Sequence, residues 1–523
     1  MVLGFNLRDS LRNKRDIGTV ILRNDRLEEI IDLVNEKYVD TVNNNTLYKD
    51  AVSGILKSLD PHTVYIPPED LQEVNDDLDG GFSGIGVEFS IMRDTIAVTG
   101  VIEDGPAAGA GVETGDQIIK VGDSMVAGVN ITSDRIIHLL KGRQSSKVYV
   151  TVMRPAGALK QVSITRGIIP IYSIDAGIML DSVTGFIKIN RFSATTFTEF
   201  SKALQKLKDK GAKQLVLDLR DNPGGYLDAA TSIADAFLDD NKLVVYTQGI
   251  HSQKTEYRAS EKGAFEDGKL VVLVDESSAS ASEILSGAIQ DWDRGVIAGR
   301  RTFGKGLVQE QYDLPGGSAL RLTIAKYYTP SGRCIQRSFA KGRDAYMEDY
   351  EKRFESGELL GADTAGNADT TRFYTAHHRV VYGGGGITPD VYVPYDTSRF
   401  SVTMESMIFS ENLKTAIWNY FMRNRSRLNF KDIAAFNHSF NDEAAIKDSY
   451  LDMLSGGKRK DALKELERPV NADYFNLQIK AQLARILFHE NGYYAISAKE
   501  DNAVNKALEI MNSGQYSKII SGK

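Results

Sequence analysis

Two short segments of the chain carry residue types that could perform nucleophilic chemistry. The stretch ESSASASEI at 276–284 holds four serines and two alanines, and it joins the apolar run KLVVLVD to a helical pattern. Farther along, GRRTFGKGLVQEQ places Lys305 between two glycines. A lysine can take the proton of a serine hydroxyl if burial or neighbouring charges lower its pKa. The serines taken alone also fit a plain helix-capping junction.

A third glycine-marked loop, LRDNPGGYLDA, follows the strand predicted at 214–219. The Pro-Gly-Gly turn leads into a helical pattern and would leave backbone N–H groups pointing outward at a helix N-terminus. Such groups can bind an oxyanion. The serine stretch also joins a strand to a helix, so both loops should lie at the carboxyl edge of one sheet, where sites in open α/β sheets form.

A phosphate-binding loop is the rival interpretation of the lysine segment, because Gly299 to Lys305 matches G-x-x-x-x-G-K. The residue after the lysine is Gly306, where a hydroxyl would be needed to hold Mg²⁺. The following LVQEQYDL has the pattern of a strand rather than a helix. Both departures disfavour a nucleotide site.

Other catalytic centres are not indicated. The seven histidines lie outside G-x-S-x-G and H-E-x-x-H contexts, and His62 in DPHTVY fits a hydrogen-bonding turn residue. The single cysteine, Cys334, excludes an intrachain disulfide and any multi-cysteine metal site. We therefore expect no metal and no cofactor.

Length and local sequence pattern predict four regions, since 523 residues are too many for a single hydrophobic core. Helical spacing predicts a helical region at 1–78, with Leu27, Ile30, Ile31 and Val34 on one helix face. Short strands and glycine turns predict a β-rich module at 79–168. Alternating strands and helices predict an α/β layer domain at 169–398 with a parallel-rich sheet. Residues 399–523 return to helical spacing.

The alternation in the third region includes GFIKI, QLVLDL and KLVVLVD as strands, with helices between them. One helix opens with Thr196 and Glu199 in a capping-box pattern and continues with an apolar stripe that begins at Phe197 and Phe200. Residues 338–382 are polar and poorly periodic, and they predict an insertion or long loop.

The net charge of −7 and the absence of a long basic run give no reason to expect nucleic acid as a partner. No apolar run reaches the roughly 18 residues that span a bilayer, so we expect a soluble chain as given.

The segment SASASEILSGAIQDWDRGVIAGRRTFGKGLVQ, preceded by LDLRDNPGG and GFSGIGVEF, closely resembles the carboxyl-terminal processing proteases, also called tail-specific proteases. The resemblance runs from about residue 27 to 337 and resumes at GITPDVYVP. It implies an S41 peptidase with a ClpP/crotonase-like α/β core and an inserted PDZ module between helical regions.

The resemblance also implies a Ser/Lys site. Ser280 matches the family's nucleophile, Lys305 its general base and Gln309 the residue that orients the lysine. The backbone N–H groups of Ala281 and Gly224 match the oxyanion hole.

Asp291 matches a further family position. Eleven residues along a helix place it about 16 Å from Ser280, so we expect a structural role, capping or pairing near the helix end.

The β-rich module resembles a PDZ domain, in which Gly84, Ile85, Gly86 and Val87 match the carboxylate-binding loop. Successive N–H groups would capture a terminal carboxylate while the peptide adds as a strand. The implied partners are proteins or peptides with free, apolar C-termini.

The resemblance implies exposure in the periplasm or cell envelope, with an export segment absent from the sequence given. The 338–382 insertion and the helical tail match no motif and could serve dimerisation, an adaptor or substrate gating. A catalytically silent PDZ scaffold is the alternative function, which the joint presence of Ser280, Lys305 and Gln309 disfavours.

Overall fold

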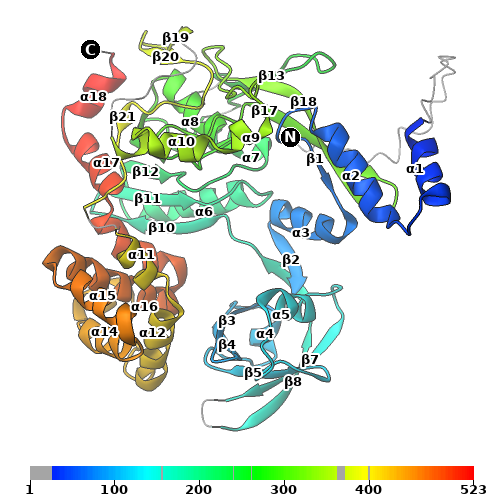
Figure 1. The fold of residues 1–523 in the computed structure, drawn as a ribbon. Coiled ribbons are helices and arrows are strands. Elements are labelled where there is room, and N and C mark those ends of the chain that lie inside the picture. The colour runs from blue at the N-terminus through cyan, green and yellow to red at the C-terminus, as the bar shows by residue number, and fades with distance from the viewer. Residues whose placement is uncertain are drawn as a thin grey trace.

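The computed structural model describes residues 26–154, 157–239, 241–260, 262–361, 371–398 and 401–522. The α/β core occupies the upper part of Figure 1, a small β module lies below it, and a helical bundle lies beside that module. None of the helices in these ranges is long and apolar enough to cross a membrane.

A six-stranded sheet forms the centre of the core, in the order β10-β11-β12-β15-β16-β21. Its strands are β10 (Ile174–Met179), β11 (Thr184–Ile189), β12 (Gln214–Asp218), β15 (Lys269–Val274), β16 (Val296–Gly299) and β21 (Val391–Tyr392). All neighbours pair in parallel except β10, which is antiparallel to β11. The expected parallel-rich sheet is therefore present.

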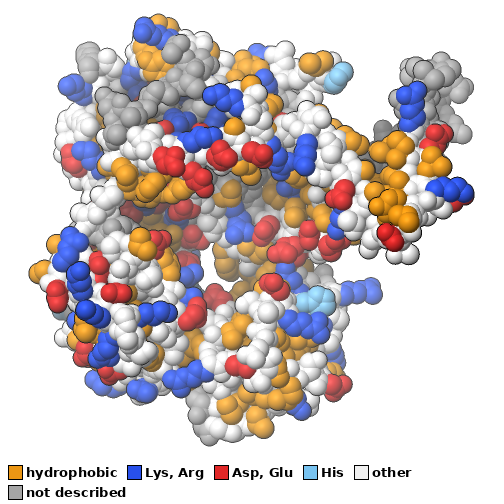
Figure 2. Space-filling model, viewed as in Figure 1, with side chains coloured by type: hydrophobic (Ala, Val, Ile, Leu, Met, Phe, Trp, Pro, Cys, Tyr) orange, Lys and Arg blue, Asp and Glu red, His pale blue; other side chains and the backbone are white. Residues whose placement is uncertain are grey.

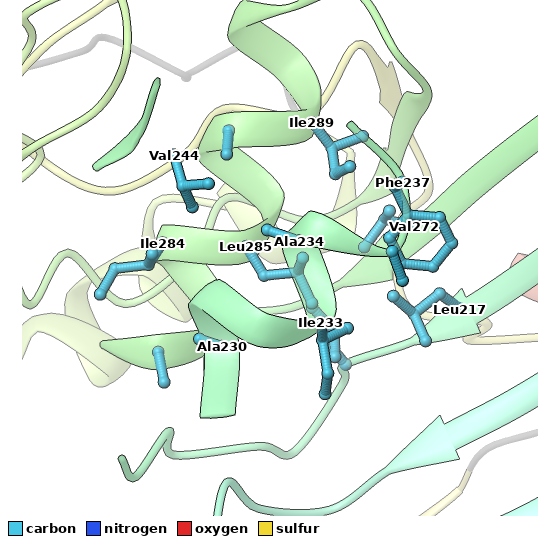
Figure 3. Packing of buried hydrophobic residues seen from close by; sticks show 14 of the residues in the cluster. Leu217, Ala230, Ile233, Ala234, Phe237, Val244, Val272, Ile284, Leu285 and Ile289 are labelled. Carbon is cyan, nitrogen blue, oxygen red and sulfur yellow. The ribbon is translucent and has the colours of Figure 1, made fainter. Parts of the chain in front are cut away.

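Alternate side chains of these strands face two different layers. One face packs against α6 (Thr196–Asp209), α7 (Leu227–Asp235) and α8 (Ala281–Asp291). In Figure 3, Leu217 and Val272 of the sheet lie beside Ile233 of α7 and beside Phe237, which follows that helix. The other face packs against α17 (Asn502–Asn512) and α18 (Gln515–Ile520) at the end of the chain.

A second sheet, antiparallel throughout, lies beside the first, in the order β1-β18-β13-β14 with β17 paired to β18. Its strands are β1 (Val64–Ile66), β13 (Leu243–Gln248), β14 (Thr255–Arg258), β17 (Leu307–Leu314) and β18 (Ser318–Tyr328). The lysine loop thus leads into a strand, as its pattern predicted. That topology differs from a phosphate-binding loop, which leads into a helix.

The β module is a sheet in the order β3-β4-β5-β7-β8, with β6 paired to β5. Its elements are β3 (Val87–Met92), β4 (Thr95–Val101), α4 (Pro106–Gly109), β5 (Gln117–Val121), β6 (Ser124–Met125), α5 (Ser133–Leu140), β7 (Lys147–Met153) and β8 (Leu159–Thr165). A two-stranded ribbon of β2 (Gly81–Gly84) and β9 (Gly167–Pro170) joins the module to the core.

The amino-terminal helices are α1 (Arg26–Lys37), α2 (Asn44–Leu56) and α3 (Pro68–Asp79). The predicted apolar face of α1 does not enter a core, because no residue of this helix is buried. Leu27 and Ile30 are 44% and 57% exposed. Figure 2 shows hydrophobic side chains along this projecting arm.

The carboxyl-terminal bundle contains α11 (Val402–Ile408), α12 (Glu411–Asn424), α13 (Ile433–Ser439), α14 (Glu443–Asp452), α15 (Gly456–Leu466) and α16 (Pro469–Ser497), followed by the short η3 (Ala498–Glu500). Its core includes Met404, Phe421 and Ile479, and it extends to Ala97 of the β module. The bundle therefore contacts the module as well as the core.

In the part that the structure describes, residues 338–382 form short helices and a hairpin, so the long-loop alternative is wrong, while the alternative of an insertion stays a prediction. They include α9 (Arg343–Met347), α10 (Asp349–Glu355), η2 (Glu358–Leu360) and the hairpin of β19 (Arg372–Tyr374) with β20 (Val380–Tyr382). Buried polar contacts explain how polar sequence can be ordered here. Arg301 and Arg353 both bind the carboxylate of Glu358.

Helix α6 gives a matched test of this packing. Phe200 is fully buried against Phe237, whereas Phe197, one turn earlier, is 42% exposed. We expect Phe200→Ala to lower the free energy of unfolding of the core by about 3–5 kcal/mol, because it leaves a cavity. Thermal unfolding followed by circular dichroism measures this loss, with Phe197→Ala as the control. Equal losses in the two variants would contradict the packing described.

Candidate active site

A cavity of about 670 Å³ lies where three segments meet. They are the serine turn at 276–284, the lysine loop at 300–306 and the Pro-Gly-Gly turn at 223–225. Ser280, Lys305 and Gln309 all line the cavity, together with Gly224 and Gly225 of the Pro-Gly-Gly turn. The residues come from the start of α8, the loop before β17, β17 itself and the loop after β12. Three segments far apart in the sequence thus bring their polar groups to one cavity.

Ser280 occupies a strained turn at the start of α8. Its φ of 54° and ψ of −110° lie outside the regions that non-glycine residues usually adopt. Such conformations cost about 1–3 kcal/mol and persist where the surroundings hold them. Here the Ser280 N–H donates to Glu283 Oε2 at 2.9 Å, and the Tyr327 hydroxyl donates to the Ser280 carbonyl at 3.1 Å.

The buried carboxylate of Glu283 ties the serine turn to the lysine loop. Besides the Ser280 N–H, it accepts the Thr302 hydroxyl at 2.6 Å, the Gly304 N–H at 2.7 Å and the Lys305 N–H at 2.8 Å. Burial raises the pKa of Glu283, while the four hydrogen bonds oppose that rise. Glu283 therefore fixes the backbone on both sides of the cavity.

The amine of Lys305 lies inside the cavity and donates to Gln309 Oε1 at 2.9 Å. Gln309 in turn donates through Nε2 to the carbonyl of His62. Burial and, to a smaller extent, the positive charge of Arg321 lower the pKa of Lys305 to about 8, against the opposing charges of Asp60 and Glu283. Among the described residues, no hydrogen bond joins this amine to the Ser280 hydroxyl.

The Pro-Gly-Gly turn packs directly on the serine turn. A Cβ at Gly224, whose φ is +98°, would lie 2.8 Å from Ser280 Cβ and 2.9 Å from Ala281 N. The N–H of Ala281, the first residue of α8, has no acceptor within the described part of the chain. The Gly224 N–H donates to Asn222 Oδ1 at 2.9 Å, so in this conformation it is already engaged.

The carboxyl-terminal segment braces the start of that turn. Arg220 pairs with the buried Asp218 at 2.7 Å and with Asp501, the residue that caps α17, at 3.0 Å. The positive charges of Arg220 and of Lys188 lower the pKa of Asp218 to about 2, against its burial. The helices at the end of the chain thus contact the loop that carries Gly224.

Asp291 lies outside the cavity, at the last residue of α8. Its carboxylate pairs with Arg333 at 2.7 Å and accepts the Ser331 N–H at 2.9 Å. This pairing at the helix end is the structural role expected for it.

A second cavity, of about 310 Å³, lies in the β module. Gly84, Ile85, Gly86 and Val87 line it, beside the apolar side chains of Phe82, Phe89, Ile137 and Leu140. In the described part of the chain, the N–H groups of Ile85 and Gly86 donate no backbone hydrogen bond outside strands. Helix α3 is a wall shared by both cavities, because Asp77 lines each of them.

Several residues that shape the site were not predicted from the sequence. Glu283 stood within the serine motif, three residues after Ser280, and this S-x-x-E spacing could have marked it. The His62 carbonyl, Asn222 and Arg321 carried no comparable signal, because their roles depend on contacts between distant segments.

The described residues hold no group of three or more His, Cys, Asp or Glu side chains arranged to bind a metal. The nucleophilic groups that line the first cavity include the hydroxyl of Ser280 and the amine of Lys305.

Comparison with known proteins decides the family. The chain is 36% identical over 318 residues to the carboxy-terminal-processing protease of Bartonella bacilliformis, covering 60% of this chain and 72% of that protein. This chain belongs to the carboxy-terminal-processing proteases of peptidase family S41. The family models for Peptidase family S41 and for the PDZ domain match residues 183–342 and 83–165. The protein is a serine-type peptidase with a PDZ domain.

Other relatives share the same description. A protein of Staphylococcus haemolyticus named as a CtpA-like serine protease is 30% identical over 438 residues, which cover 82% of this chain and 84% of that one. Among solved structures, the photosystem II D1 C-terminal processing protease is 26% identical, covering 71% of this chain and 86% of that one, with a TM-score of 0.37.

The role of Glu283 can be tested by an isosteric change. Glu283→Gln replaces one acceptor oxygen by an NH₂ group that must face N–H or O–H donors, so the serine turn and lysine loop shift apart. We expect kcat for peptide hydrolysis to fall about a hundredfold, as displacements of about 1 Å can cause. Steady-state kinetics on a fluorogenic peptide measures this change.

The control is Glu256→Gln, at an exposed carboxylate of β14. It should leave kcat unchanged. A Glu283→Gln enzyme with wild-type kcat would show that the carboxylate does not hold the site.

Proposed function

We propose that the protein is an endopeptidase in which Ser280 is the nucleophile, Lys305 the general base and Gln309 the residue that orients the lysine. The observation that carries this proposal is the environment of Lys305. Its amine is buried in the cavity that Ser280 lines, is held by Gln309, and has a pKa lowered to about 8. A lysine in this state can accept a proton near neutral pH.

The reaction begins when the Ser280 oxygen attacks the scissile carbonyl and its proton passes to the Lys305 amine. The resulting ammonium then protonates the leaving amine as the C–N bond breaks, which leaves an acyl-Ser280 ester and neutral Lys305. Water enters, gives a proton to Lys305 and attacks the ester carbonyl. The acid product leaves, and the proton on Lys305 returns to the Ser280 oxygen.

The N–H groups of Ala281 and Gly224 would stabilise the oxyanion of both tetrahedral intermediates. The unengaged N–H of Ala281 at the start of α8 supports this role. The Gly224 N–H would first exchange its bond to Asn222 for the oxyanion. Removing one such donor typically costs a factor of about 10²–10³ in kcat.

The PDZ domain would select the substrate. Its cavity combines apolar side chains with the loop from Gly84 to Val87, an arrangement suited to an apolar tail with a free carboxylate. We therefore infer cleavage of unfolded or exported proteins near apolar C-termini, in the periplasm or cell envelope. The exposed apolar face of α1 supports contact with a second copy of the chain or with an adaptor.

We also infer a ClpP/crotonase-like arrangement for the core. The parallel sheet with α6, α7 and α8 on one face and the antiparallel sheet of β13, β17 and β18 beside it support this assignment. A catalytically silent scaffold has no need of a buried lysine aligned by a glutamine, so the peptidase function is favoured.

The dyad is tested by single substitutions. We expect Ser280→Ala and Lys305→Ala each to lower kcat about a thousandfold or more, because each removes a group that the chemical step requires. Mass spectrometry of fragments from an unfolded protein with an apolar C-terminus measures cleavage.

Ser277→Ala in the same turn and Lys326→Ala on β18 are the controls, because both side chains are exposed. Both controls should cleave like the wild type. Cleavage activity that survives in Ser280→Ala would contradict the assignment of Ser280 as the nucleophile.

The pH dependence follows from the lysine. Lys305 must be neutral to accept the serine proton, so activity is lost as pH falls through its pKa of about 8 and is full above it. We expect log kcat/KM to rise with unit slope below about pH 8 and to level off above.

Arg321→Gln removes a charge that lowers the pKa of Lys305 and should move this limb to higher pH. Arg258→Gln, at an exposed arginine of β14, should not move it. If the rising part of the pH–rate profile stays at the same pH in both variants, a group other than Lys305 controls it.

Tail recognition is tested by binding to the uncleaving Ser280→Ala protein. A peptide with an apolar free C-terminus should bind at least about tenfold more tightly than its C-terminal amide, because the amide lacks the charged acceptor for the loop N–H groups. Isothermal titration calorimetry measures the two affinities. Ile137→Asp, which places a charge on the apolar wall, should weaken the free-acid peptide; equal affinities for acid and amide would refute tail recognition.

A further inference from the structure

Arg321 is a cation in the catalytic cavity whose charge has no carboxylate partner. It lies on β18 and lines the cavity with Ser280 and Lys305. Among the described residues, its guanidinium donates one hydrogen bond, from Nη2 to Gln311 Oε1 at 3.1 Å, and it forms no ion pair with a carboxylate. A guanidinium has five N–H donors, so most of its donor capacity is open to a ligand.

The other charged groups of this cavity are accounted for differently. Arg191 pairs with Asp77 at 2.9 Å, so its charge is already balanced. Asp221, the other carboxylate that lines the cavity, belongs to an exposed residue. Among the groups that line the cavity, Arg321 and Lys305 are therefore the cations without a described counter-ion, and the proposed chemistry uses Lys305 as a base.

Strand register places Arg321 close to the reacting groups. It pairs across the sheet with Gln311, which lies two residues after Gln309 on β17. Gln309 holds the Lys305 amine, so the Cα of Arg321 lies opposite a position about 7 Å along β17 from the residue that orients the base. That separation corresponds to about two residues of extended peptide.

An unpaired guanidinium half-buried at a substrate cavity is costly to leave without an anion and matches a carboxylate in geometry, with two parallel N–H···O bonds. We propose that Arg321 binds a carboxylate of the substrate within about three residues of the scissile bond. The carboxylate is either an Asp or Glu side chain or the α-carboxylate at the end of the tail. This inference rests on the proposed function of Ser280 and Lys305 and adds a specificity residue to it.

The experiment uses two sets of fluorogenic peptides that share one cleavable sequence. In the first set the C-terminus is amidated and each position within three residues of the scissile bond carries Asp or its neutral isostere Asn. In the second set the peptide ends two or three residues beyond the scissile bond as a free acid or as an amide. Each pair gives a carboxylate preference, the ratio of the two kcat/KM values.

We expect the wild type to show a preference of about tenfold or more at one position or at the terminus. Arg321→Gln should reduce that ratio to about one, and Arg321→Lys should retain part of it. Arg191→Gln is the matched control, since it removes an already paired arginine of the same cavity and should leave the ratio intact. A structural role of Arg321 would lower both kcat/KM values together and leave the ratio unchanged.

The two peptide sets distinguish a side-chain carboxylate from a terminal one. They also distinguish failure of the Arg321 inference from failure of the proposed function. A preference for Asp over Asn assigns a side chain, and a preference for acid over amide that is lost in Arg321→Gln assigns the terminus. An acid preference that persists in Arg321→Gln and is lost in Ile137→Asp belongs to the PDZ domain and overturns the inference. Equal carboxylate preferences in the wild type and in Arg321→Gln would also overturn the inference about Arg321. If that cleavage still depends on Ser280, the proposed function remains supported. Peptides that the wild type does not cleave at all overturn both.

Discussion

The candidate site depends on one buried carboxylate. Glu283 accepts hydrogen bonds at once from the serine turn, which follows β15 of the first sheet, and from the lysine loop, which leads into β17 of the second. A buried carboxylate without partners would be strongly disfavoured, so the four donors and the acid stabilise each other. Because the donors are mostly backbone N–H groups, the positions of Ser280 and Lys305 are set by backbone rather than by flexible side chains.

Buried charges near this carboxylate differ in their pairing, depending on whether they lie inside or outside the cavity. Away from the cavity, buried charges are paired, as Asp218 is with Arg220 and Asp291 with Arg333. Inside the cavity, Lys305 and Arg321 have no carboxylate partner, and their mutual repulsion helps to lower the pKa of the lysine. An arrangement of this kind stabilises neither cation by itself, and it suits a cavity that a substrate must enter.

The two cavities and the carboxyl-terminal helices meet around the same segments. Helix α3 lines both the catalytic cavity and the PDZ cavity, and Asp501 near the end of the chain pairs with Arg220 before the Pro-Gly-Gly turn. The helical bundle also packs on Ala97 of the PDZ domain. The carboxyl-terminal helices thus contact both the PDZ domain and the loop that precedes the turn.

Local sequence predicted those features that depend on neighbours along the chain. The parallel sheet followed from strand and helix periodicity, the Ser280 loop from a run of small residues after a strand, and the Lys305 loop from its flanking glycines; the chemistry of both loops stays a prediction. Tertiary pairing decided the rest. Periodicity could not show that 307–314 joins a second, antiparallel sheet, that the apolar face of α1 stays exposed, or that the His62 carbonyl holds Gln309. The Arg321 charge was unremarkable until the register placed it beside Gln311.

The most direct test of the central claim is to trap the acyl-enzyme. A peptide p-nitrophenyl ester that ends at the scissile residue is mixed with the enzyme, quenched in acid during the first turnover, and the acylated residue is located by peptide mapping and mass spectrometry. The account predicts one acyl group on Ser280, with little or none in Glu283→Gln or Lys305→Ala. An acyl group on another residue, or hydrolysis through Ser280 at full rate in Glu283→Gln, would contradict it.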